Sequence, residues 1–322
     1  MPEMVASVLG LIAGLAVLVV GGNGFVEGAA ALAQHFRVRP LIIGVIVIGF
    51  GTSAPEMLVS LFALADGQGG LALGNVVGSN IANIGLVLAA AAVITPVVVE
   101  NRVLRRELPL TLGVSLLFAA LVAGDGRIDL VDGLLLLTAF LGSLAYILGL
   151  LPRRKLDTAA IALVAGTPIS GPALTLRRAG LYTGAGLGLI LLGAQITVDQ
   201  ATTIARALGV SDSVIGLTVV AVGTSLPELV AALIAARKHQ TDLILGNVLG
   251  SNLYNLGFTA GIVGLGAGAG IGVDPVLRFT SIGMMILFTI VLLPLLRRGH
   301  RLDRLEGSLL LLAYLVYTVL LF

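Results

Sequence analysis

The sequence contains no cysteine and no tryptophan, and it has only three histidines among 322 residues. The missing cysteine excludes disulfide bonds, thiolate metal sites and cysteine nucleophiles. The histidines lie in or beside polar segments, so a zinc site within an apolar segment would lack its usual ligands. Charged residues make up only 11% of the chain, whereas soluble domains carry about 25%. The composition therefore excludes an ordinary soluble domain.

Hydrophobic residues are abundant, at 57% of the chain, and the mean hydropathy is +1.09. Apolar stretches of roughly 20 residues recur along the whole length, and such stretches are typical of transmembrane helices. The net charge of +2 is small and the basic residues form no single patch, so we expect membrane lipid as a partner and no nucleic acid. The N-terminus carries Glu3 and no basic run, which favours the start of a span over a cleaved signal peptide.

Short charged or glycine-rich breaks divide the apolar sequence into ten predicted spans, so we expect an all-α polytopic membrane protein. The first and sixth spans are long for one perpendicular crossing, which predicts tilt or an interfacial extension. The longest polar interval, 152–178, joins the two halves and is too short for a separate domain. The expected spans are 4–33, 41–65, 71–95, 108–123, 130–151, 179–205, 212–236, 243–267, 276–296 and 305–322.

The basic residues fall on alternate loops, and this predicts the orientation. With an external N-terminus, the internal loops hold 16 of the 19 Lys and Arg residues and the external side holds only Arg127, Arg206 and Arg278. Positive charge is retained on the cytoplasmic side, so both termini are expected outside. A shift of the span count by one would destroy this sorting, which therefore supports the count as well.

The chain carries an internal repeat. The segment GTSAPE at 51–56 returns as GTSLPE at 223–228, and the same offset of 172 carries GNVVGSN at 74–80 onto GNVLGSN at 246–252. Two matches at one offset indicate duplication. Equivalent points are five spans apart, so the second copy must cross the membrane in the opposite sense, a plan that recurs in transporters. We expect a first five-helix repeat at 1–151, a cytoplasmic linker at 152–178 and a second repeat at 179–322.

Each copy of the first motif should break a helix near the membrane midplane. Pro55 and Pro227 remove a backbone donor and clash with the preceding turn. Irregular backbone at this depth is tolerated only where it is buried in protein or lines a wet cavity. The freed carbonyls, expected without protein partners, are also cation ligands, although the hydroxyls of the motif could serve only to satisfy the backbone.

Glu56 and Glu228 lie well inside apolar segments, and an intramembrane carboxylate suggests function by default. No Lys or Arg is expected at similar depth, so the counter-charge should be a bound cation or a proton. Across a pseudo-twofold axis the repeats would offer only hard oxygen donors, which suit Ca²⁺ with its 6–8 oxygen ligands. Two carboxylates match one Ca²⁺ in charge, but they could also hold two monovalent ions or protons.

These doubled motifs resemble the paired alpha repeats of the calcium/cation antiporters, which include the sodium/calcium exchangers. The motif regions are 44–85 and 216–257, and short prokaryotic members likewise lack a large cytoplasmic loop. The resemblance implies antiport of Ca²⁺ against Na⁺ in the cytoplasmic membrane of a prokaryote, with no cofactor and no obligate protein partner. It also implies that the cation is held by Glu56, Glu228, Thr52, Ser53, Ser79, Asn83, Thr224, Ser225, Ser251, Asn255 and the carbonyls of Gly49 and Ala221.

In some prokaryotic exchangers one of the two ring asparagines is aspartate, whereas here Asn83 and Asn255 are both asparagine. Coupling to Na⁺ and coupling to H⁺ therefore both stay open. A cation channel would fit a single inverted pair poorly, since filters are often rings of repeated subunits. An intramembrane enzyme is disfavoured because no histidine, cysteine or aspartate pair is expected at membrane depth. Asn75 and Asn247 are interpreted as packing or capping residues rather than ligands.

Overall fold

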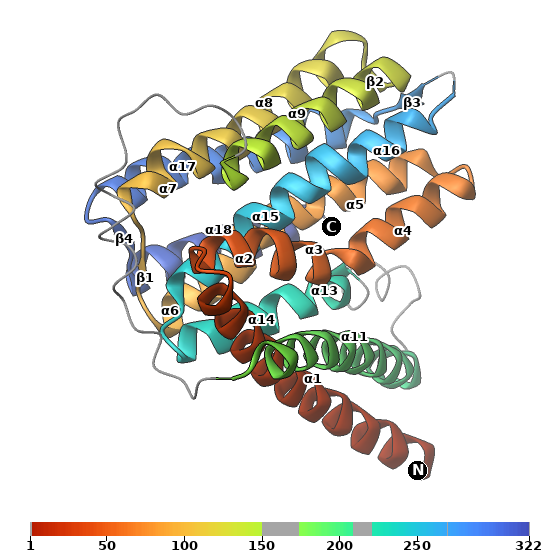
Figure 1. Ribbon diagram of the computed structural model, residues 1–322. Coiled ribbons are helices and arrows are strands. Elements are labelled where there is room, and N and C mark those ends of the chain that lie inside the picture. Colours follow the sequence, from red (N-terminus) through yellow and green to blue (C-terminus); the bar gives the residue numbers. More distant parts are fainter. Residues whose placement is uncertain (1, 150–173, 209–220, 269, 322) are drawn as a thin grey trace.

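The computed structural model describes residues 2–149, 174–208, 221–268 and 270–321 (Figure 1). Most of the predicted linker 152–178, and the start of the predicted seventh span, lie outside these residues. The described part is almost entirely helical, as the composition predicts, with four strands of two residues each. The all-α prediction is therefore confirmed for this part of the chain.

The elements of the two halves follow the same order. Those of the first half are α1 (Pro2–His35), α2 (Pro40–Ile43), η1 (Gly44–Gly49), α3 (Phe50–Thr52), α4 (Ala54–Ala65), α5 (Gly69–Ala82), η2 (Asn83–Leu88), α6 (Ala89–Ile94), β1 (Val97–Val98), α7 (Asn101–Arg105), α8 (Glu107–Asp125), β2 (Arg127–Ile128) and α9 (Leu130–Leu148). Those of the second are α11 (Leu176–Ala207), α13 (Ala221–Thr224), α14 (Leu226–Arg237), α15 (Thr241–Leu253), η4 (Tyr254–Thr259), α16 (Ala260–Leu265), β3 (Ile271–Gly272), η5 (Val276–Ser281), α17 (Ile282–Arg297), β4 (Arg301–Leu302) and α18 (Arg304–Leu320). The η segments are π-helical.

Six of the described helices are long and apolar enough to cross a membrane. A seventh candidate is the pair Pro40–Thr52 and Ala54–Ala65, which is bent by 45° at Ser53. Large hydrophobic side chains on these helices, such as Leu9, Phe62 and Leu134, are exposed on the protein surface. Because such side chains are normal where lipid is the solvent, the chain is an integral membrane protein.

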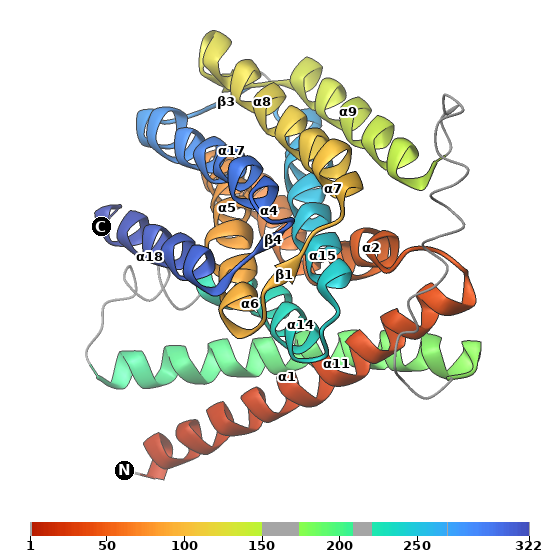
Figure 2. The same ribbon diagram turned by 90° about the vertical axis from the view of Figure 1, so that its left-hand side faces the viewer.

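The two longest helices, α1 and α11, pack against each other along their length beside the remaining helices (Figures 1 and 2). They run antiparallel, since a Cβ on Gly14 would meet Thr197 whereas one on Gly28 would meet Thr183. The offset of 172 relates Gly14 to Gly186 and Gly21 to Gly193. Gly21 packs against Gly186, and Gly193 packs against Gly14, so the contact itself has twofold symmetry.

The two small sheets each join one repeat to the other. β1 pairs with β4 at one end of the molecule, and β2 pairs with β3 at the opposite end (Figure 1). α9 and α18 follow β2 and β4, and both begin with a capping box, formed by Asp129 with Asp132 and by Asp303 with Glu306. Asp303 follows Asp129 by 174 residues, which is two more than the offset of 172 between the motifs. The repeat therefore extends beyond the motifs with a shift of two residues.

The middle of the molecule is formed by α5–η2–α6, α15–η4–α16 and the broken helices α2–η1–α3–α4 and α13–α14, which contact one another. The helical run formed by α5, η2 and α6 is apolar enough to face lipid, yet it is largely buried: 72% of its most apolar stretch lies inside the protein. The polar motifs of both repeats therefore lie in the interior, surrounded by other helices.

Candidate functional site

The first break in a helix occurs at Ser53, and the sequence explains why. Pro55 is the second residue of α4 and has no backbone donor, so regular hydrogen bonding cannot continue from α3 into α4. Ser53 has φ −79° and ψ 3°, and its N–H donates to the carbonyl of Gly49 at 3.2 Å. Thr52 donates its hydroxyl hydrogen to the carbonyl of Ile48 at 3.0 Å. The break predicted from the motif is thus confirmed.

The second repeat has the same local geometry. α13 ends at Thr224, Ser225 has φ −88° and ψ 4°, and Pro227 lies in the first turn of α14. Each carboxylate, Glu56 or Glu228, therefore lies in the first turn after its break. This end of a helix carries partial positive charge from unsatisfied N–H groups, which stabilises an anionic side chain.

The structure brings the two motifs together by crosswise contacts. The hydroxyl of Ser53 donates to Glu228 Oε1 at 3.0 Å, and the hydroxyl of Ser225 donates to Glu56 Oε1 at 3.4 Å. Glu56 and Glu228 are 2% and 1% exposed and are close enough to repel each other electrostatically. Each serine thus binds the carboxylate of the other repeat, and the site belongs to both halves of the chain.

The carboxylates have oxygen atoms with no protein partner. Glu56 Oε2 and Glu228 Oε2 are both buried, and no hydrogen bond to either exists among the described residues. Within the same part of the chain neither glutamate forms an ion pair; the carboxylates that do are Glu27, Glu100 and Glu107. Buried anionic oxygens are costly when unpaired, so these two need a cation or a proton.

The predicted asparagines Asn83 and Asn255 are also buried in the interior. Asn83 begins η2 and donates its amide to Asn252 Oδ1 at 2.9 Å, while its own Oδ1 is buried without a partner. Asn255 lies in η4, is 1% exposed, and neither its Nδ2 nor its Oδ1 has a partner in the described residues. Both asparagines lie in π-helical turns, which often mark functional sites.

The other oxygen atoms that were predicted to bind the cation lie in several different environments. The Gly49 carbonyl accepts two hydrogen bonds, one from the Ser251 hydroxyl of α15 at 3.3 Å and one from the Ser53 N–H of its own segment. Ser79 is buried on α5, and Thr224 lies within reach of Glu56. Ala221 begins α13, next to residues that are not described.

Asn75 and Asn247, which the sequence indicated as packing or capping residues, bond to the backbone of the turns that follow the two breaks. Asn75 Nδ2 donates to the Glu56 carbonyl at 3.0 Å, and Asn247 Nδ2 donates to the Glu228 carbonyl at 3.2 Å. Asn247 Oδ1 also accepts from the hydroxyl of Thr52 at 3.1 Å. These bonds fix each carboxylate-bearing turn on the neighbouring helix.

Two buried asparagines were missed by the sequence reasoning. Asn252 is the partner of Asn83, and Asn80 has a buried Oδ1 without a partner in the described residues. Each is the last residue of its GNVxGSN motif, so the repetition of this motif in the sequence could have identified both asparagines. In the described part of the chain no group of three or more His, Cys, Asp or Glu could hold a metal ion. The site is therefore two carboxylates among hydroxyl, amide and carbonyl groups.

Known proteins resemble this chain over most of its length. Residues 6–149 and 179–322 match the family described as sodium/calcium exchanger protein. The chain is 36% identical to a putative antiporter CaxA of Alkalimonas amylolytica, with 99% of each chain covered. It is 36% identical to the inner membrane protein YrbG of Escherichia coli strain K12, covering 97% of this chain and 95% of the relative.

A third relative is the sodium/calcium exchanger MaX1 of Methanosarcina acetivorans, which is 30% identical with 97% of each chain covered. A solved structure of the sodium-calcium exchanger NCX_Mj superposes with a TM-score of 0.84 and 31% identity, over 99% of this chain and 100% of that one. The family match covers both halves separately, in agreement with the internal repeat. The chain therefore belongs to the sodium/calcium exchanger family, a family of membrane transporters.

Proposed function

We propose that this protein is a secondary active antiporter that exchanges Ca²⁺ for Na⁺ across the cytoplasmic membrane of a prokaryote. The observation that supports this most is the buried pair Glu56 and Glu228, held crosswise by Ser225 and Ser53 without a basic partner in the described residues. Two carboxylates with neutral oxygens around them can accept one Ca²⁺ or two Na⁺, so the two ions compete for one site.

The proposed cation ligands are the oxygens of Glu56 and Glu228 and those of the surrounding motif residues. The unpartnered Oε2 atoms and Asn83 Oδ1 are ready to bind a cation without breaking any protein hydrogen bond seen in the described residues. The Gly49 carbonyl becomes available once the Ser251 hydroxyl rotates away from it. The remaining proposed ligands are Thr52, Ser53, Ser79, Thr224, Ser225, Ser251, Asn255 and the Ala221 carbonyl.

Exchange follows from the cost of an empty site. Two bare carboxylates would be poorly solvated while the site is closed, so the conformational change should occur only with cations bound. The long antiparallel pair α1 and α11 is the proposed moving element, because it forms a layer beside the site-bearing helices (Figure 2). Alternating access would result from this pair shifting against the rest of the molecule.

We further propose ten spans arranged as two inverted repeats, at 1–151 and 179–322, joined by 152–178. Three segments would join the seven span candidates to make ten. α15–η4–α16 is a continuous helical run of 25 residues, and α18 has 17 residues. α14 follows its break as α4 does. Both termini would then lie outside, opposite the basic loops.

Transport in proteoliposomes tests the proposal. A Na⁺ gradient should drive ⁴⁵Ca²⁺ uptake when protonophores have collapsed any pH gradient. Uptake that follows only an imposed pH gradient would show the second candidate, an exchanger of Ca²⁺ or another divalent cation for H⁺, which the unpartnered carboxylate oxygens would also permit. Ion conductance without saturable counterflow would contradict both.

A further inference from the structure

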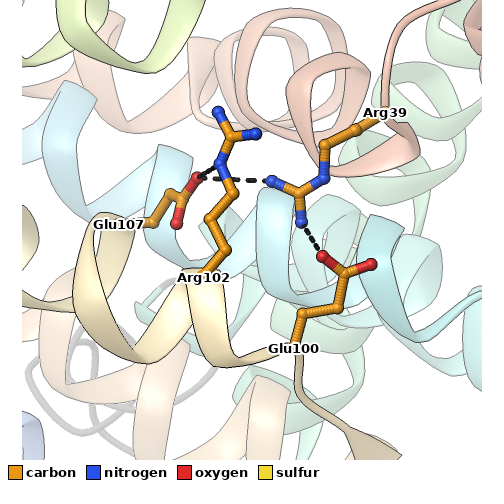
Figure 3. A network of polar contacts seen from close by, with 4 residues as sticks. All are labelled: Arg39, Glu100, Arg102 and Glu107. Carbon is orange, nitrogen blue, oxygen red and sulfur yellow. Dashed lines mark hydrogen bonds and ion pairs between the residues drawn. The ribbon is translucent and has the colours of Figure 1, made fainter. Parts of the chain in front are cut away.

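A partly buried network of charges (Figure 3) lies at the end of the molecule that carries the β1–β4 sheet. The Arg39 guanidinium bonds to the carboxylate of Glu100 and lies 3.5 Å from Glu107 Oε1, while Arg102 Nε lies 3.6 Å from the same Glu107 oxygen. The side chains of Arg39 and Glu107 are 9% and 3% exposed. The network lies outside the cation site, and the transport chemistry proposed above does not use it.

Arg39 connects the first broken helix to the body of the protein. It immediately precedes Pro40 in an extended conformation, so it forms the junction between α1 and α2. Its two partners come from elsewhere: Glu100 lies between β1 and α7, and Glu107 begins α8. From Arg39 the helix runs through α2, η1 and α3 to Thr52 and Ser53 at the cation site. The network thus fixes the far end of the segment that carries these two residues.

This half-helix covers α15 so closely that the two backbones touch. A Cβ on Gly44 would lie 2.8 Å from Gly246 Cα, and a Cβ on Gly246 would lie 2.5 Å from the Leu41 carbonyl. α15 carries Asn247 and Ser251 to the cation site. Asp242 in its first turn is attracted to Arg39 and repelled by Glu100 and Glu107, so α15 also presents a charge to this network.

Buried ion pairs are weak evidence of net stability, because desolvation offsets much of their attraction, but they can specify one arrangement over another. Among the described residues, this anchor occurs in the first repeat. The offset of 172 aligns Arg39 with Ser211, which lies outside the described residues and has no charge to contribute. A set of ion pairs that the described residues show in one repeat and not in the other suits a contact that forms in one transport state and breaks in the other.

We propose that Arg39 is a positioning residue for transport: its ion pairs with Glu100 and Glu107 hold the start of α2 against the segment that carries α7 and α8, so that α2 and η1 stay packed on α15 and close the route from the basic-loop side to the two carboxylates. The inference rests on alternating access in the proposed function, but it does not depend on which ions are exchanged. Loss of the anchor should favour the state that is open toward the basic loops.

The absence of native cysteine makes a direct test possible. Leu243→Cys places one thiol in the contact, since Leu243 is fully buried and its carbonyl would lie 3.1 Å from a Cβ on Gly44. A membrane-impermeant thiol reagent is applied from each side in turn, using vesicles of opposite orientation. In this background Arg39→Gln should raise the labelling rate at least tenfold from the basic-loop side, whereas Arg39→Lys should restore much of the protection.

Arg105→Gln is the matched control, because Arg105 has the same charge and is exposed on α7, so labelling should not change. If Arg39→Gln does not fold, Glu100→Gln carries the test, since it removes the most exposed acid of the network. Unchanged labelling in a folded variant, or faster labelling from the opposite side, would overturn the inference. Ion fluxes are measured separately, so failure of Na⁺/Ca²⁺ exchange in the unmodified protein would contradict only the proposed function.

Discussion

At the scale of single residues, Glu56 and Glu228 are buried acids that interact across the two repeats, and neither has an ion pair within the described residues. The sequence alone indicated both residues, since each carboxylate follows a proline-broken turn inside an apolar segment. Their crosswise partners could not be predicted, because the choice between Ser53 and Ser225 depends on how the repeats dock. The spacing of residues along the chain predicts which side chains each repeat contributes to the site, but it does not predict how the two repeats contact each other.

Neutralising either glutamate should abolish cation binding without unfolding the protein. Glu56→Gln and Glu228→Gln keep the shape of the side chain but remove a buried charge that repels its neighbour. Ca²⁺ at 100 times its dissociation constant should stabilise the unmodified protein by about 2.7 kcal/mol, and this gain should vanish in both variants. The measurement is thermal unfolding in detergent with and without Ca²⁺.

Asp66→Asn is the matched control for these variants, because Asp66 ends the same helix α4 but is exposed. It should keep the full stabilisation by Ca²⁺. Without cations, the two glutamine variants should unfold at the same or a higher temperature than the unmodified protein. Undiminished stabilisation by Ca²⁺ in either glutamine variant would refute the assignment of the site.

At the scale of elements, the prolines predicted the breaks at Ser53 and Ser225, yet the four π-helical segments seen in the described residues were not predicted. A π turn needs one residue more than an α turn and has no sequence pattern of its own, so it follows from the docking of neighbouring helices. The closeness of α1 and α11 was not predicted either. Glycines occur throughout this chain, and only the packed structure shows which of them touch another backbone.

Close packing of α1 and α11 predicts opposite effects for two glycines on one helix. A Cβ on Gly186 would lie 2.4 Å from the Phe25 backbone N and 2.8 Å from the Gly21 carbonyl, whereas one on Gly188 would meet nothing within 4 Å. Gly186→Ala should therefore destabilise the protein by roughly 1–3 kcal/mol through overpacking. Gly188→Ala should be neutral or stabilising by up to about 1 kcal/mol, because alanine favours the helix. Thermal unfolding compares the two, and equal effects would contradict the contact.

At the scale of the whole molecule, the duplication is the feature that the sequence predicted best, and the structure extends it. The antiparallel pair α1 and α11, the two capping boxes and the reciprocal sheets all follow the repeat. The symmetry is incomplete, however, because Arg39 has no charged counterpart at position 211. An exchanger must favour different contacts in its two states, so departures from symmetry of this kind are where we expect the states to differ.

The charge of the site predicts how the whole transporter responds to voltage. Glu56 and Glu228 give the site two negative charges, which either one Ca²⁺ or two Na⁺ would neutralise, so the loaded site would carry no net charge across the membrane. Exchange should then be electroneutral, and the rate of Na⁺-driven ⁴⁵Ca²⁺ uptake should not change when valinomycin and a K⁺ gradient impose a potential. One uncompensated charge would instead contribute about 2.3 kcal/mol per 100 mV, which is roughly a fifty-fold change in accumulation.

Adding a carboxylate at the centre should make the same exchange sensitive to voltage. Asn255→Asp places a third negative charge at a position whose amide atoms have no partner in the described residues, and this charge should bind one further Na⁺. Ca²⁺ would then move against three Na⁺, and an imposed potential would change the uptake. Gln68→Glu, which adds the same charge at an exposed position between α4 and α5, should leave uptake independent of voltage. Voltage-dependent uptake by the unmodified protein would show that a third monovalent ion binds without a third carboxylate, since neutral oxygens alone would then hold it.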